Sequence, residues 1–215
     1  IPAKYEKESL PKVLDELKKF DVKKNIVLEK SDKLTVEAIS NYDCKIIYQD
    51  SFGYGDALKK GIQTTETEFF CIFNADGSFN PDELNIMISK IEKDKYDFVF
   101  ATRYEKNCGS DDDTIVTYVG NYIFTLLGKI FFKLGITDIL YTFVMGRTSF
   151  AKNLELTAKD FSFCVELPIK AKRANYKICT SKSYERSRIA GKKKVNAFKD
   201  GLKILLSMIK LFSRY

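Results

Sequence analysis

The sequence predicts an α/β fold in which flanking helices cover a mostly parallel central sheet. Short apolar runs with strand character alternate along the chain with amphipathic helical patterns, which is typical of parallel sheets. One run, 69–73, contains only Phe, Cys and Ile, as expected of a strand buried on both faces. The composition, 45% apolar and 30% charged, can supply one core, so we expect the 215 residues to form a single domain.

The other elements follow from the same patterns. Apolar residues at helical spacing from Leu10 to Leu17 predict an amphipathic helix over 8–20. Further strands are expected at 25–28, 45–48, 96–101 and 176–179. Further helices are expected at 34–40, 53–62, 81–93 and 163–171, with a C-terminal amphipathic helical part at 197–215. The opening residues, 1–3, have the pattern of a strand end, so we expect further sequence before them.

The strongest candidate site follows strand 69–73. Asn74 and Asp76 alternate across Ala75, and in an extended segment such residues point the same way. Their oxygens can therefore aim at one hard cation, such as Mg²⁺, shared with a substrate's phosphates. Gly77 allows the chain to turn, and Pro81 follows at the start of a helix. An Asx-type turn without a ligand fits the spacing equally well.

Charge and composition restrict the chemistry. The net charge of +7 favours phosphates, nucleic acid or acidic lipid as partners. The chain has no histidine, which excludes His-based triads and His-ligated metals, so any reaction must rest on carboxylates and cations, with or without a metal. Five cysteines without a C-x-x-C pair predict reduced thiols in a cytosolic setting rather than disulfides or a zinc site. We recognise no nucleic-acid module, so nucleic acid is not an expected partner.

The segment 115–136 is unusually apolar. Its only charges are Lys129 and Lys133, and one side of the expected helix carries Tyr, Phe and Lys, which is typical of an interfacial helix at a membrane. A buried helix packed against a protein partner is the alternative. We find no secretory signal and no clean run of 18 apolar residues that predicts a membrane span.

Acidic residues elsewhere are harder to interpret. The acids at 111–113 lie in a polar segment, and we expect a solvated loop there rather than a metal site. Glu166 stands alone in an apolar helix-like run, where it is either a satisfied core carboxylate or a functional acid. The glycines at 53 and 55 precede a helix N-terminus, which attracts phosphate, although a plain tight turn fits as well.

Taken together, seven stretches in family order resemble the family 2 glycosyltransferases, especially the dolichyl- or polyprenyl-phosphate sugar synthases. The segment 1–10 is similar to P-x-Y-N-E-E-x-x-L, 53–61 to G-x-G-x-A-x-x-x-G and 74–78 to the D-A-D-x-Q/S metal motif. The remaining matches are 101–104 to G-S-R-Y, 137–138 to T/S-D, 165–171 to V-E-L-x-x-K-A and 188–194 to R-x-G-x-S-K.

The resemblance implies a GT-A type, Rossmann-like fold. It also implies inverting transfer of a sugar from a UDP- or GDP-linked donor to a polyprenyl phosphate, with Mg²⁺ or Mn²⁺, at the cytoplasmic face of a membrane. The implied catalytic residues are Asp76, Asp138 and Glu166, and the implied metal ligands are Asp76 and Asn74. The implied donor-binding residues are Pro2, Ala3, Glu6, Glu29, Gly55, Asn74, Ala75 and Arg103. Phosphates of donor or acceptor would contact Arg103, Arg188, Lys192 and Lys194. A homo-oligomer is compatible with the sequence.

This chain departs from the family pattern mainly at the donor site. Lys4-Tyr5 replaces Tyr-Asn, Leu28 replaces an Asp of the nucleoside motif, and Asn74 replaces the first Asp of the metal motif. The usual T-G-F-R segment has become Tyr-Thr-Phe-Val at 141–144. These changes leave open an altered donor, reduced activity or an inactive member. The alternatives are therefore a glycosyltransferase with a soluble or glycan acceptor, and a non-catalytic protein of the same fold.

Overall fold

The computed structural model describes residues 1–191 and 193–213. Its largest sheet has four strands in the order β3-β6-β4-β7. The strands are β3 (Phe69–Ile72), β4 (Phe98–Thr102), β6 (Val144–Arg147) and β7 (Ile178–Lys182). β4 and β7 are parallel, whereas β6 lies antiparallel between β3 and β4. The sheet is therefore mixed, because the unpredicted strand β6 enters it in the opposite direction. β3 buries Phe70 and Ile72 on alternate positions only.

Two smaller sheets complete the β-structure. The strands β1 (Asn25–Leu28) and β2 (Lys45–Tyr48) are parallel and have the predicted bounds. The opening residues run parallel to β1, with the amide of Ala3 donating to the carbonyl of Val27 at 2.9 Å. β5 (Gly109–Ser110) and β8 (Tyr184–Glu185) form a short parallel pair. The opening residues and β1 therefore end at the same edge, which brings the segments that carry Glu6 and Glu29 together.

Helices flank these sheets. They are α1 (Leu10–Leu17), α2 (Lys33–Ala38), α3 (Tyr54–Thr64), α4 (Leu84–Glu92), α5 (Ile115–Phe132), α6 (Thr148–Asn153), α7 (Phe163–Arg173) and α8 (Ala197–Ser213), with a 3₁₀ turn η1 (Pro81–Glu83) before α4. The apolar face predicted for α1 is buried, from Leu10 to Leu17. The predicted start of the helix after the metal motif is confirmed, because the Asn80 side chain accepts from the amide of Asp82 at 3.1 Å ahead of Pro81.

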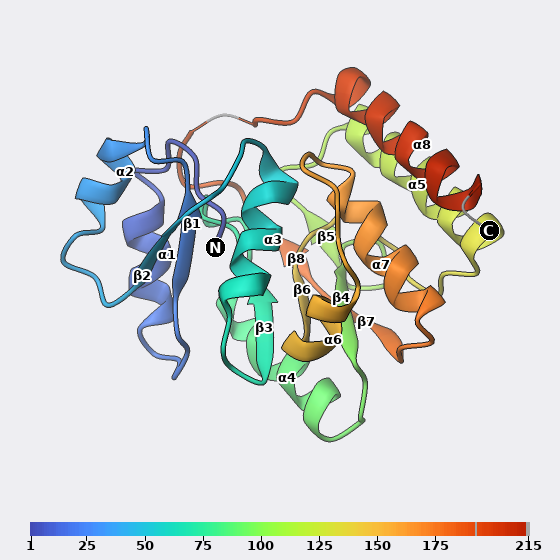
Figure 1. Ribbon diagram of the computed structural model, residues 1–215, viewed down its shortest axis with the longest axis horizontal. Coiled ribbons are helices and arrows are strands. Elements are labelled where there is room, and N and C mark those ends of the chain that lie inside the picture. The colour runs from blue at the N-terminus through green and yellow to red at the C-terminus, as the bar shows by residue number, and fades with distance from the viewer. Residues whose placement is uncertain (192, 214–215) are drawn as a thin grey trace.

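The helices α5 and α8 lie side by side at one edge of the molecule, opposite the edge formed by α1, α2, β1 and β2 (Figure 1). Their C-terminal halves are joined by edge-to-face contacts of Phe131 and Phe132 with Phe212, at ring-centroid distances of 5.6 and 6.1 Å. Near the start of α8, Gly201 lies beside Phe124 of α5, and near its end, Phe212 lies beside Phe132 of α5. The two helices therefore run in the same direction.

The orientation of α5 differs from that of an ordinary core helix. Asn121 and Gly128 are its buried residues, and Phe124, Leu127 and Phe132 pack partly buried against the core, whereas its other large apolar side chains face outward. The exposed residues are Ile115, Val116, Tyr118, Val119, Tyr122, Ile123, Leu126, Ile130 and Phe131. By length and composition α5 is the one helix of the described residues that could cross a membrane, with a mean hydropathy of 1.4 over 18 residues. This differs from the sequence-based expectation that no run predicts a span.

Candidate active site

A large cavity of about 1020 Å³ opens at the end of β3 and joins three parts of the chain. Its polar end is lined by Pro2 and Ala3 of the opening residues, by Glu6 just after them and by Glu29 just after β1. Its centre is lined by Asn74, Ala75 and Asp76. Its apolar arm lies between the N-terminal halves of α5 and α8. The structure therefore brings together the predicted metal-ligating residues and, except for Gly55, the predicted donor-binding residues, and connects them to an apolar groove.

Asp76 is held at the centre of this cavity by the turn that follows β3. One oxygen, Oδ1, accepts from the amide of Ser78 at 3.0 Å, and Oδ2 lies 3.5 Å from Nη2 of Arg188. Asn74 donates from Nδ2 to Oγ of Ser78 at 3.3 Å. Gly77 has a φ of +83°, and a Cβ at this position would overlap the side chain of Ile189. Gly77 is therefore required both for the turn and for the segment that closes over it.

The donor set fits a divalent ion that is shared with a substrate. Within residues 1–191 and 193–213, no three acidic, Cys or His side chains are grouped closely enough to hold an ion by themselves. Asp76 supplies one carboxylate and Asn74 one amide beside it. Mg²⁺ is commonly held by one or two carboxylates together with substrate phosphates. The site therefore suits an ion that arrives with a diphosphate.

A basic segment, described at 186–191 and 193–194, covers the metal motif. The amide of Ile189 donates to the carbonyl of Asp76 at 2.8 Å, and Arg188 also lies 3.2 Å from Oδ2 of Asp112. Lys193 pairs with Asp112 at 3.2 Å, and Lys194 pairs with Glu6. Burial acts to lower the pKa of Arg188, but the hydrogen bond to Asp112 and the nearby carboxylates outweigh it and raise this pKa. Three cations thus converge on the carboxylates of the donor end. Lys192, also predicted to bind phosphate, lies outside the described residues.

Asp112 and Asp113 correct the expectation of a solvated acidic loop. Both line the cavity, and Asp113 accepts hydrogen bonds from Tyr104 and Thr117. Sequence reasoning missed the role of Asp112 because its partners, Arg188 and Lys193, come from a segment 76 or more residues away. Three consecutive acids were the signal available.

Arg103 and Asp138 form a buried ion pair beneath the cavity. Nε and Nη2 of Arg103 donate to Asp138 at 2.7 and 3.0 Å, and Nη1 donates to Glu185 at 2.8 Å. The Asp138 side chain is fully buried, also accepts from Asn121, and does not line the cavity. The predicted catalytic role of Asp138 therefore has no support in its surroundings, which indicate a structural role. Arg103 lines the cavity, but its guanidinium is engaged, so its predicted phosphate contact stays a prediction.

Glu166 also lies outside the lining of the cavity, so its predicted catalytic role stays a prediction. Its carboxylate accepts from the amides of Thr157 and Ala158 and pairs with Lys170 at 2.9 Å. Burial acts to raise the pKa of Glu166, but these hydrogen bonds outweigh it and lower the pKa below its usual value. Glu166 therefore holds the loop after α6. Backbone oxygens of that loop lie within 2.7 Å of where a Cβ at Gly55 would be, so Gly55 serves close packing rather than the predicted donor contact.

Glu166→Gln is expected to lower the free energy of unfolding at pH 7 by about 1.5–3 kcal/mol, the usual worth of hydrogen bonds to a charged group. Because the folded-state pKa is lowered, this stabilisation is present above the ordinary pKa of 4.5 and is lost as the pH falls through the folded-state pKa. Urea unfolding at several pH values should therefore show wild type and variant converging in acid. Exposed Glu66→Gln is the control; a constant difference at all pH values would contradict this role.

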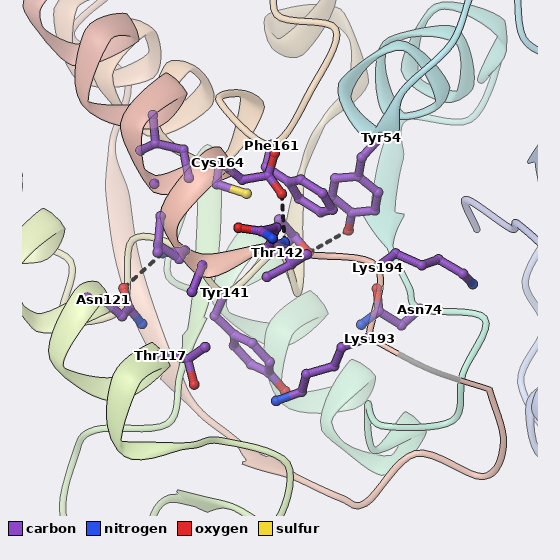
Figure 2. A pocket seen from close by; sticks show the side chains of 18 of the residues that line it. Tyr54, Asn74, Thr117, Asn121, Tyr141, Thr142, Phe161, Cys164, Lys193 and Lys194 are labelled. Carbon is purple, nitrogen blue, oxygen red and sulfur yellow. Dashed lines mark hydrogen bonds between the residues drawn. The ribbon is translucent and has the colours of Figure 1, made fainter.

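The floor of the cavity contains polar side chains that the sequence analysis did not single out. Tyr54 hydrogen-bonds to Thr142 at 2.7 Å and stacks on Phe161 with ring centroids 5.0 Å apart (Figure 2). Cys164 lies beside them, and burial raises the pKa of its thiol to about 12. The thiol is therefore protonated at neutral pH and does not serve as a base or nucleophile.

Comparison with known proteins gives both a family and a fold. The sequence profile described as Glycosyl transferase family 2 matches residues 1–154. Glucosyl-3-phosphoglycerate synthase from Mycobacterium tuberculosis, in complex with Mn²⁺, UDP and glucosyl-3-phosphoglycerate, is similar with a TM-score of 0.79 and 12% identity, over 99% of this chain and 78% of that one. The same synthase with Mg²⁺ and UDP has a TM-score of 0.79 and 11% identity, over 99% and 77% of the two chains. At these identities the similarity shows the GT-A type α/β fold.

Proposed function

The chain belongs to glycosyl transferase family 2 and is a glycosyltransferase of GT-A type fold, and from this premise we propose that it transfers a sugar from a UDP- or GDP-linked donor to a polyprenyl phosphate. The observation that carries the proposal is the continuity of the cavity. One end contains Asp76 and the cations of the basic segment, and the other end is the apolar groove between α5 and α8. An acceptor with an anionic head and a long apolar chain matches both ends.

The donor diphosphate would lie at the polar end. Mg²⁺ or Mn²⁺, as contained with UDP in the structurally similar synthase, would neutralise the charge that builds on the departing diphosphate. Asp76 and Asn74 would hold that ion. Arg188, Lys193 and Lys194 are paired with carboxylates and would exchange those partners for donor or acceptor phosphate oxygens.

Transfer would proceed by direct displacement with inversion. An oxygen of the acceptor phosphate forms a bond to C1 of the sugar, and the bond from C1 to the diphosphate oxygen breaks with its electron pair. A phosphate monoester is largely ionised near neutral pH, since its second pKa is about 6, so no proton needs to be removed. The lack of histidine and the protonated thiol of Cys164 are compatible with this reaction.

We further propose that α5 and α8 lie in the cytoplasmic surface of a membrane. Outward-facing apolar residues on both helices, with Lys129 and Lys203 also exposed, give the composition of an interfacial anchor. Asn121 and Thr125 accept hydrogen bonds from the amides of Leu140 and Ile139, which attach the middle of α5 to the body of the protein. This attachment favours a helix lying on the membrane over one crossing it.

Replacing Leu126, Ile130 and Ile209 together with Ser is expected to reduce binding to phosphatidylglycerol-containing vesicles by at least about tenfold. All three side chains are exposed and lie outside the cavity, and each has apolar area that a membrane would cover. Co-sedimentation measures the effect, and Lys129→Ala with Lys133→Ala should weaken binding in a salt-dependent way. The control is Phe52→Ser with Ile86→Ser, which are exposed elsewhere. Equal binding by all variants would contradict the membrane proposal.

A soluble phosphorylated acceptor is the second candidate. The similarity to a synthase whose structure contains glucosyl-3-phosphoglycerate favours it. A non-catalytic role is the third, because Lys4 pairs with Glu29 at 2.8 Å in the donor end and Asn74 replaces a carboxylate. Isothermal titration with UDP and GDP, in Mn²⁺ and in EDTA, separates the non-catalytic role from the two transferase candidates. If the folded protein bound neither nucleotide, the non-catalytic role would remain.

A further inference from the structure

We propose that Gly120 of α5 and Gly201 of α8 determine which acceptor chains fit the apolar arm, an inference that rests on the proposed function. Both residues line the cavity, one on each wall of the groove. Glycine inside a helix costs about 1 kcal/mol relative to alanine, so a glycine within each of two helices requires a reason other than helix stability. If no protein atom occupies the space where its Cβ would be, room for a ligand is such a reason.

The protein leaves both positions open. A Cβ at Gly120 would meet no atom within 4 Å, and a Cβ at Gly201 would meet only Phe124, at 4.0 Å. Gly128, on the same helix as Gly120, is different: its Cβ would lie 3.0 Å from Ile139 and 3.1 Å from Leu134. Close packing therefore explains Gly128, but it explains neither of the two glycines that face the cavity.

The two glycines stand in the middle of the rows that face the groove. On α5 the row follows helical spacing from Val116 through Gly120 to Phe124, and on α8 it follows the same spacing from Ala197 through Gly201 to Leu205; all six residues line the cavity. The glycines thus widen the groove at two successive levels, because Gly201 lies beside Phe124, one helical turn beyond Gly120. Both positions line the cavity and leave room for a Cβ, so a side chain added at either would reduce the space in the groove.

The occupant that this shape favours is a branched apolar chain with an anionic head. The groove leads to the part of the cavity lined by Asp112, Arg188 and Lys193, where cations can receive a phosphate. An isoprenoid chain carries a methyl branch on every five-carbon unit, so it is wider than a straight alkyl chain. The widening at Gly120 and Gly201 would admit the first units of such a chain.

The test compares Gly120→Ala, Gly120→Leu and Gly201→Leu with wild type and with Gly135→Leu. Gly135 is an exposed residue outside the cavity whose Cβ would also meet nothing within 4 Å, so it controls for adding a large side chain at an open position. The measured quantities are kcat/KM for transfer to a detergent-solubilised polyprenyl phosphate, the affinity for farnesyl phosphate by calorimetry, the affinity for the donor nucleotide and the melting temperature.

We expect both Leu variants to lose at least about tenfold in kcat/KM and in farnesyl phosphate affinity, with nucleotide affinity unchanged. Melting temperatures should stay equal or rise, because replacing a helical glycine stabilises the helix, and Gly120→Ala should have an intermediate effect on transfer. If wild type transfers sugar and both Leu variants keep the wild-type kcat/KM and farnesyl phosphate affinity, this inference is overturned while the proposed function stands. If the wild-type protein binds nucleotide but neither transfers sugar to the polyprenyl phosphate nor binds farnesyl phosphate, the polyprenyl acceptor is overturned and this inference with it.

Discussion

Asp76→Asn is expected to lower sugar transfer by about 10²- to 10³-fold, the largest effect of any single substitution in the cavity. The carboxylate is the charged group of the metal motif, and a metal that stabilises the leaving group contributes several kcal/mol to the transition state. The substitution keeps the shape of the side chain and an oxygen that can accept from the amide of Ser78. Initial rates at saturating donor, with Mg²⁺ or Mn²⁺, measure the loss.

Two further readouts connect that loss to the metal. The affinity for the nucleoside diphosphate should fall in Mg²⁺ and stay the same in EDTA, because the ion joins Asp76 to the diphosphate. Asp82→Asn is the matched control, since Asp82 is an exposed carboxylate a few residues further on that pairs with Lys19 outside the cavity. Transfer by Asp76→Asn at the wild-type rate would mean that Asp76 does not hold the ion.

Asp138→Ala is expected to lower the free energy of unfolding by about 3–5 kcal/mol, the usual cost of removing one partner of a buried ion pair. The loss leaves the Arg103 side chain, 10% exposed, with one strong carboxylate partner, Glu185, and removes the acceptor of Asn121. Chemical denaturation at pH 7 measures the change. Asp50→Ala, which breaks an exposed pair with Lys60, is expected to change stability very little.

Asp138→Asn separates the structural role of this residue from the catalytic role that the resemblance implies. The amide removes the charge and keeps the volume, so the protein should be destabilised but still fold. If Asp138 positions Arg103 and α5, kcat measured well below the melting temperature should change much less than in Asp76→Asn. A loss of kcat equal to that of Asp76→Asn, in folded protein, would restore the catalytic role.

The elements that could be predicted from the sequence are those defined by local patterns. β1 and β2 have the predicted bounds, and α1 buries the predicted face, because short apolar runs and helical spacing are visible within a few residues. β6 could not be predicted in the same way, because its four residues include Gly146 and Arg147 and carry no strand period. The direction of β6 depends on its partners β3 and β4, which are distant in sequence.

The orientation of α5 and the roles of the buried acids depend on tertiary contacts. Apolar residues surround much of α5, so its pattern does not say that Asn121 faces the protein. Asp138 matches a motif of the family that the chain resembles, and Glu166 stands alone in an apolar run, so both have the appearance of functional acids. In the structure Arg103 satisfies Asp138, and the amides of Thr157 and Ala158 satisfy Glu166. The place of Asp76 at the sheet edge could be predicted, because a strand and the turn that follows it position this residue within one short segment.

The most direct test of the central claim is a transfer assay with purified protein, labelled UDP- and GDP-sugars, Mg²⁺ or Mn²⁺, and two acceptors offered separately. One acceptor is a polyprenyl phosphate in vesicles and the other is 3-phosphoglycerate. The proposed function predicts that label from one donor enters the organic phase with the polyprenyl phosphate, that EDTA abolishes this and that Asp76→Asn loses it. Label appearing only on 3-phosphoglycerate, or on neither acceptor with protein shown to be folded, would contradict it.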